Sequence, residues 1–133
     1  MREDSITLTV PARSDYAKTV RMTAAQLASR LGMTYDQVDD VRIAAEEAFV
    51  YACELVTEDA EVTFAFRVTE TELDVTVGPL PACDDEAEAS ASEGYAGFIL
   101  KSVCDEFSLV RGGGICHLRL ACRLAPPTGD AGA

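Results

Sequence analysis

The feature that most constrains this chain is a change in the period of its apolar residues. From Ile6 to Val10, apolar and polar residues alternate, which is typical of a half-buried strand. From about residue 17 to residue 56 the period becomes three to four, as in amphipathic helices, and beyond residue 60 the alternation returns. Each such element has one apolar face to bury, so the pattern predicts helices packed against a sheet.

The first helix is expected to run to about Arg30. Ser14 or Asp15 can cap its beginning, because their side-chain oxygens accept hydrogen bonds from free backbone N–H groups. Gly32 follows its end, where a left-handed backbone conformation commonly stops a helix.

The second helix is expected to run from about Tyr35 to Val56. Thr34 and Gln37 have the spacing of a capping box, which marks its beginning. Several of its core-facing positions are alanines, so the helix can lie close to whatever it covers.

The second half of the chain is predicted to be mainly strands. We expect strands over 62–68 and 73–77, a short helix over 95–104 and a final hairpin over 106–124. Residues 78–94 are rich in Pro, Ala, Ser and acidic residues and lack a core period, so we expect a long loop there.

This order of elements predicts an α+β two-layer sandwich, in which a mostly antiparallel sheet carries helices on one face. At 133 residues, the chain is expected to form a single domain over 1–125. The last residues, 126–133, are expected to be a disordered tail.

The charge and hydropathy of the chain exclude several classes of function. The formal net charge of −12 argues against a nucleic-acid-binding protein, which needs a basic surface. No apolar run is long enough for a membrane-spanning helix, and no polybasic stretch suggests membrane docking. The first ten residues lack the apolar stretch of a signal peptide, so a cytoplasmic protein is expected.

The five cysteines are scattered, with no CxxC, and are expected to be reduced and mostly buried. The segment "CHLRLAC" contains possible zinc ligands in Cys116, His117 and Cys122. On a strand the two cysteines would share a face with Leu118 and Leu120, while His117 would point the other way. We therefore expect core cysteines and no metal site.

Three segments carry a resemblance to a known family. They are "VRMTAAQLASRLGMTYDQVDDVRIAAEEAFVYACEL", "GYAGFILKSVCDEFSL" and "VRGGGICHLRLACRL". With the order of elements, they resemble the Bergerat ATP-binding fold of gyrases, Hsp90-type chaperones and histidine kinases. The closer resemblance is to the small bacterial branch of this fold, the anti-sigma factor serine-protein kinases of the RsbW and SpoIIAB type, and it covers about residues 5 to 124.

The resemblance implies ATP and Mg²⁺ as cofactors and a site on the second helix. In the family, this helix carries a glutamate that acts as general base and, four residues later, an asparagine that helps to hold Mg²⁺. Glu47 matches the glutamate, whereas Tyr51 stands where the asparagine is expected. Tyrosine is a poor ligand for a hard cation, which prefers carboxylate, carbonyl or water oxygen. An alternative is that Glu47 is a solvated residue at the margin of the apolar stripe.

The other nucleotide motifs match in part. Gly78 falls near the aspartate that recognises adenine in the family, and it offers no side-chain acceptor; a shifted register could instead bring in Asp84 or Asp85. In the glycine-rich motif Gly94 and Gly97 are retained, and Ala96 replaces a further glycine. Backbone N–H groups at a helix start could still bind an anion there.

The charges around these motifs are unfavourable for a nucleotide. Between Arg67 and Lys101 there is no basic residue and there are eight acidic ones, five of them within 78–94. Repulsion would oppose a triphosphate unless a metal ion offset it. The acidic loop is either a solvated segment or a surface for a basic partner.

The prediction that follows is an anti-sigma-type regulatory protein that binds a sigma factor or its antagonist, with ATP and Mg²⁺ binding weakened or lost. One alternative is an active ATP-dependent serine/threonine protein kinase of the same family. Another is a non-catalytic interaction module. The resemblance also implies a possible homodimer, formed through the sheet edge and the first helix.

Overall fold

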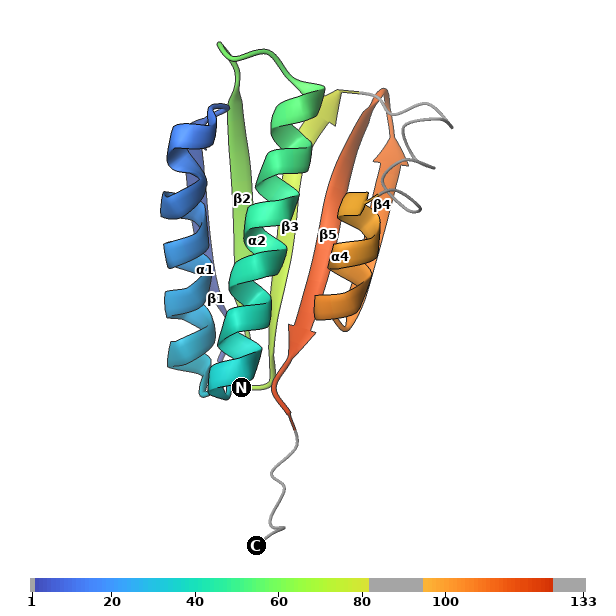
Figure 1. The fold of residues 1–133 in the computed structure, drawn as a ribbon. Coiled ribbons are helices and arrows are strands. Elements are labelled where there is room, and N and C mark those ends of the chain that lie inside the picture. Colours follow the sequence, from blue (N-terminus) through green and yellow to red (C-terminus); the bar gives the residue numbers. More distant parts are fainter. Residues whose placement is uncertain (1, 82–94, 126–133) are drawn as a thin grey trace, which may run out of the picture.

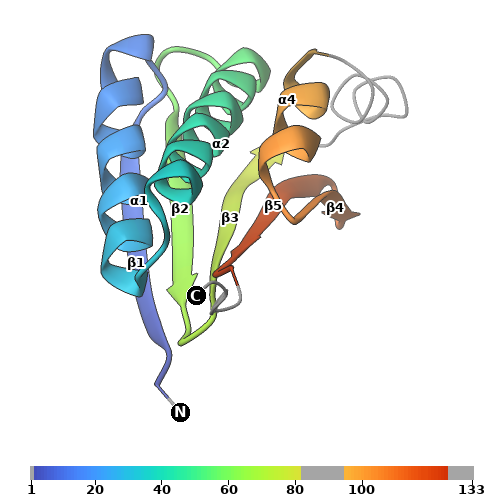
Figure 2. The same cartoon turned by 60° about the horizontal axis from the view of Figure 1, so that its bottom comes forward.

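The computed structural model describes residues 2–81 and 95–125 of the chain. One sheet is covered on one face by helices, and its other face is left open (Figures 1 and 2). In chain order the elements are β1 (Asp4–Pro11), the 3₁₀ turn η1 (Ser14–Tyr16), α1 (Ala17–Leu31), α2 (Tyr35–Leu55), β2 (Glu61–Val68), β3 (Glu72–Pro81), α4 (Tyr95–Val103), β4 (Glu106–Gly112) and β5 (Ile115–Arg123).

The five strands form an antiparallel sheet in the order β1-β2-β3-β5-β4. Helix α1 packs against α2, and α2 packs against both β3 and α4. In Figure 1, α1, α2 and α4 lie side by side over the sheet, with α2 in the middle. The predicted α+β two-layer fold is therefore confirmed.

The ends of the two long helices follow their local sequence. The capping box at α2 is present, because Gln37 N–H donates to Thr34 Oγ1 at 3.2 Å and Thr34 N–H donates to Gln37 Oε1 at 3.1 Å. Gly32 ends α1 in the left-handed region, at φ 99°. The predicted capping by Ser14 or Asp15 is wrong, since the chain enters through η1 and neither η1 nor α1 has a side-chain cap.

The core lies between the helices and the sheet. Phe49 of α2 packs on Phe64 of β2, with ring centroids 6.3 Å apart, and Phe64 stacks on Phe66 at 5.9 Å. The predicted small positions of α2 lie on this interface, where Ala45, Ala48 and Ala52 are all at most 2% exposed. Because alanine side chains are short, α2 can approach the sheet closely.

Strand β3 extends further than the sequence suggested. Residues 78–81 were predicted to begin a loop, but they continue β3, where Leu80 pairs with Cys116 and is 2% exposed. The register shifts between Val77 and Leu80, so a bulge absorbs the extra residue and both side chains remain buried. The rest of the predicted loop, 82–94, and the predicted tail, 126–133, lie outside the described residues.

The predicted faces of β5 are confirmed by burial. Cys116, Leu118, Leu120 and Cys122 are all at most 6% exposed. The prediction of reduced cysteines holds for Cys53, Cys104 and Cys122, but it is wrong for Cys116, which is disulfide-bonded. No helix within the described residues is long and apolar enough to cross a membrane.

Candidate functional site

The predicted site residues lie on three elements that pack together. Glu47 and Tyr51 are one turn apart on α2, Gly78 lies in β3 and Gly97 is buried in α4. Since α2 packs against both β3 and α4, the elements that carry the predicted site residues are in contact through α2. Gly94 lies outside the described residues.

The adjacent glutamates of α2 have different surroundings. Glu46 accepts a hydrogen bond from Arg21 Nη1 of α1 at 2.7 Å, which ties the two helices together. Glu47 is half-buried and makes no hydrogen bond or ion pair within the part of the chain that the structure describes. Burial, followed by the negative charges of Glu46 and Glu54, raises the pKa of Glu47. A carboxylate with a raised pKa and no cationic partner is able to accept a proton.

Tyr51 is a core residue on the same side of α2. Its side chain is 6% exposed, and burial, with a smaller contribution from Glu54, raises the pKa of its phenol. The hydroxyl therefore stays protonated at neutral pH. A protonated phenol is a poor ligand for Mg²⁺, and the ring occupies space on this side of the helix.

Gly78 lies against β5. Its φ is +144°, and a Cβ at this position would meet Cδ2 of His117 at 2.8 Å and the carbonyl oxygen of Cys116 at 3.0 Å. His117 lies between Cys116 and Leu118, both buried under the helices, so its ring is on the open face of the sheet. A side chain at position 78 would therefore point away from α2.

These donors do not fit a magnesium-bound nucleotide as the family motifs would hold it. Tyr51 is the residue that the resemblance places at the amide ligand, and Gly78, which it places near the adenine-binding aspartate, has no side-chain acceptor. Among residues 2–81 and 95–125, no three or more His, Cys, Asp or Glu residues are arranged so that they could hold a metal ion.

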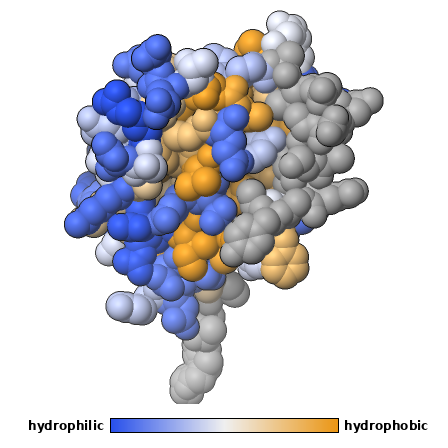
Figure 3. Space-filling model, turned by 45° about the horizontal axis from the view of Figure 1, so that its top comes forward, coloured by the Kyte–Doolittle hydropathy of each residue, from blue (hydrophilic) through white to orange (hydrophobic). Residues whose placement is uncertain are grey.

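The helix-covered face around this site is uneven in polarity. In Figure 3, hydrophilic side chains gather on the α1 side, and a strip of hydrophobic ones runs down the middle of the face. Ile43 and Val50 of α2 are among the exposed hydrophobic residues, at 39% and 41%. The central helix therefore presents apolar as well as acidic groups to solvent.

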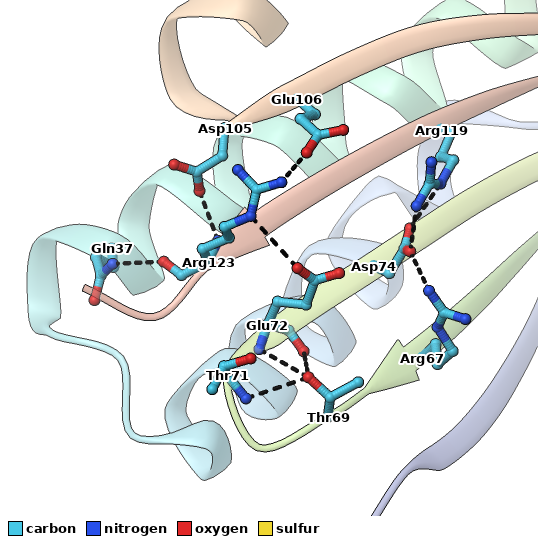
Figure 4. A network of polar contacts seen from close by, with 10 residues as sticks. All are labelled: Gln37, Arg67, Thr69, Thr71, Glu72, Asp74, Asp105, Glu106, Arg119 and Arg123. Atoms are coloured by element: carbon cyan, nitrogen blue, oxygen red, sulfur yellow. Dashed lines mark hydrogen bonds and ion pairs between the residues drawn. The ribbon is translucent and has the colours of Figure 1, made fainter. Parts of the chain in front are cut away.

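Two polar clusters were not predicted from the sequence. On the open face, Asp74 of β3 accepts hydrogen bonds from Arg67 of β2 at 2.7 Å and from Arg119 of β5 at 2.9 Å, as Figure 4 shows. At the other cluster, the start of α2 meets the end of β5, where Gln37 Nε2 donates to the carbonyl oxygen of Arg123 at 3.0 Å. Both depend on strand pairings between distant segments, which local spacing does not reveal.

A family model described as the histidine kinase-like ATPase domain matches residues 10–121. The chain belongs to this family. The match includes the two long helices, the sheet from β2 to β3 and most of β5.

Individual relatives are similar over parts of their length. The serine-protein kinase RsbW of Bacillus subtilis (strain 168) is 38% identical over 77 residues, which cover 56% of this chain and 48% of the relative. RsbW of Listeria innocua is 28% identical over 125 residues, which cover 80% of this chain and 79% of the relative. The chain thus spans about half the length of the Bacillus relative. The predicted resemblance to the RsbW type is confirmed.

A solved structure has the same fold. The crystal structure of the RsbU and RsbW domains of a Mycobacterium tuberculosis protein matches with a TM-score of 0.66 and 19% identity. The match covers 93% of this chain and 33% of that one. At this identity the likeness shows the fold alone.

Proposed function

We propose that this protein is an anti-sigma-type regulator that binds a sigma factor or its antagonist, and that its binding of Mg²⁺ and ATP is weakened or lost. The observation that carries the proposal is Tyr51, which is buried one helical turn after Glu47. The scaffold of the ATPase family is retained, while the side chain at the expected metal position is a buried phenol.

Three features support the loss of nucleotide binding. The phenol of Tyr51 keeps its proton and cannot replace an amide oxygen as a ligand for Mg²⁺. Position 78 has no acceptor for an adenine amino group, and a Cβ there would point toward His117. Without a metal ion, the five acidic residues within 78–94 would repel a triphosphate bound beside this segment.

The regulatory part of the proposal rests on the relatives. The Bacillus and Listeria relatives reported above are named serine-protein kinase RsbW. The resemblance to anti-sigma factors of this type implies binding of a sigma factor or its antagonist. A sigma factor acts in the cytoplasm, so a cytoplasmic location belongs to the proposal. Homodimer formation stays a prediction.

The proposal predicts a protein partner whose capture does not depend on nucleotide. Tagged protein is incubated with extract of its own cells, with and without about 1 mM Mg-ATP, and the bound proteins are identified by mass spectrometry. This nucleotide concentration matches a Kd of about 1 mM, which is the weakest specific binding of interest. A sigma factor or a small sigma-regulatory antagonist should dominate the catch in equal amounts under both conditions. A catch that contains neither, or that changes severalfold with Mg-ATP, would contradict the proposal.

The second candidate is an active serine/threonine kinase, and one observation favours it. Glu47 has a raised pKa and no cationic partner among residues 2–81 and 95–125, so its carboxylate is able to act as a general base. Transfer of labelled phosphate from ATP to a serine of the captured antagonist would support it. Phosphate transfer should then be abolished by Glu47→Gln. It should be retained in the control Glu46→Gln, because Glu46 forms an ion pair with Arg21.

A further inference from the structure

A groove lies at the far end of α2 from Tyr51, where α2 meets the end of α4 and the end of β5. Its cavity has a volume of about 200 Å³, and its lining includes Asp40 of α2, Cys104 and Asp105 after α4, and Cys122 of β5. Glu47, Tyr51, Gly78 and Gly97 are not among its lining residues.

Two thiols meet in this groove. Cys104 and Cys122 are both free, and both line this groove. Cys104 is half-buried, whereas Cys122 is 6% exposed. A reagent that enters from solvent therefore reaches Cys104 first.

Backbone hydrogen bonds fix the positions of Cys104 and Cys122. Cys104 N–H donates to the carbonyl oxygen of Leu100 at 2.9 Å, which fixes it to the last turn of α4. The next residue, Asp105, donates its N–H to the carbonyl oxygen of Ala121 at 2.9 Å and accepts from Arg123 N–H at 2.6 Å. Cys122 lies between these two anchors, so the backbone places Cys104 and Cys122 beside the same part of the groove.

We propose that Cys104 and Cys122 are a dithiol oxidation site, which closes to a disulfide and ties the end of α4 to β5. With a peroxide as oxidant, the sulfur of Cys104 attacks the O–O bond, giving a sulfenic acid and releasing one water. The sulfur of Cys122 then attacks the sulfenic sulfur. The S–S bond forms, the S–O bond breaks, and a second water leaves. The two thiols lose two electrons and two protons, and hydrogen peroxide is reduced to two waters.

The disulfide would act on the helix that borders the candidate site. Helix α4 carries Gly97 and packs against α2, while its C-terminal end is joined to β4. Cross-linking residues 104 and 122 would restrict the separation of this end from the sheet. We expect oxidation to slow the opening of α4 without changing the fold.

The charges around the pair set the rate of oxidation. The hydrogen bond with Cys122, then burial, then the negative charges of Cys122, Asp105 and Asp40 hold the pKa of Cys104 well above its usual range. Arg123, which also lines the groove, forms ion pairs with Glu72 and Glu106. Since the thiolate is the reacting form, the pair should oxidise slowly at neutral pH and faster as the pH rises.

The test maps disulfides in the wild-type chain. The protein is held at pH 8 with and without hydrogen peroxide, remaining thiols are alkylated, and tryptic peptides are analysed by mass spectrometry. Trypsin separates Cys104 in peptide 102–111 from Cys116 in 112–119 and Cys122 in 120–123. The expected product is 102–111 joined to 120–123, lighter by two hydrogens than the sum, and cleaved by dithiothreitol.

Matched variants test the electrostatic part. Asp40→Asn removes one carboxylate that faces the pair and should raise the rate of disulfide formation roughly two- to tenfold. Asp39→Asn is the control, because Asp39 pairs with Arg42 and does not line the groove; it should leave the rate unchanged. Equal rates in the two variants would contradict the assigned role of Asp40.

Hydrogen exchange tests the coupling to α4. Amides of 95–103 should exchange at least about fivefold more slowly in the oxidised protein, and Cys104→Ser should abolish this difference while Cys53→Ser preserves it. If peroxide oxidises Cys53 or sulfinylates Cys104 without joining 102–111 to 120–123, the proposal is wrong. If the amides of 95–103 exchange equally fast in the cross-linked and the reduced protein, the proposed effect of the disulfide on α4 is wrong.

Discussion

Among single residues, Asp74 depends most on contacts far away in the sequence. It is 4% exposed although it lies on the open face of the sheet, because Arg67 and Arg119 lie against it from the neighbouring strands. Burial alone would raise the pKa of Asp74, but the hydrogen bonds and charges of Arg119 and Arg67 outweigh burial and lower it below the usual value. The local sequence shows only an acidic residue in an alternating strand, so its partners could not be predicted.

This network predicts a pH dependence of stability. Because the pKa of Asp74 is lower in the folded state than in the unfolded state, its stabilisation is present above about pH 4 and is lost as the pH falls through the folded-state pKa. Asp74→Asn should lower the free energy of unfolding by about 1–3 kcal/mol at pH 7, and this deficit should shrink at pH 3. Urea unfolding at both pH values measures it.

The control for this prediction is an exposed ion pair of α2. Asp39→Asn removes the pairing with Arg42, which should change stability by about 0.5 kcal/mol or less. A deficit in Asp74→Asn that is constant from pH 7 to pH 3 would contradict the assigned pKa shift.

At the scale of elements, the sequence predicted the end of α1 and the start of α2 better than the start of α1 or the end of β3. Thr34 with Gln37 and the glycine at position 32 act within one turn, so their spacing alone is informative. By contrast, the Gly and Pro residues of 78–81 are typical of a loop. They remain in the sheet because a bulge and the pairing of Leu80 with Cys116 keep β3 attached to β5. Such pairing with a strand far along the chain is invisible to local patterns.

The packing at the end of β3 predicts that alanine destabilises the protein at one glycine and not at another. Gly78→Ala places a Cβ 2.8 Å from the His117 ring at a φ of +144°, so it should lower the free energy of unfolding by about 1–3 kcal/mol. Gly112→Ala is the matched control, because nothing lies within 4 Å of its Cβ, and stability should change by about 0.5 kcal/mol or less. Thermal unfolding compares them, and equal melting temperatures would contradict this packing of Gly78.

For the whole molecule, the order of the strand-like and helix-like periods of the apolar residues was sufficient to predict the fold. Strand, helix, helix and strands, each with one apolar face, leave few ways to cover a sheet, and the family match over 10–121 agrees. The candidate site was predicted only as positions along the chain. Which way position 78 faces and how deeply Tyr51 is buried depend on packing between elements. The thiol groove joins three distant segments and has no local signal at all.

The central claim is that the ATPase scaffold is retained without working magnesium–nucleotide chemistry. Isothermal titration of the full chain with Mg-ATP tests it most directly. Tyr51 in place of a metal ligand predicts no saturable heat up to about 1 mM nucleotide, which corresponds to binding weaker than about −4 kcal/mol. Saturable binding with a micromolar Kd that requires Mg²⁺ would contradict the claim.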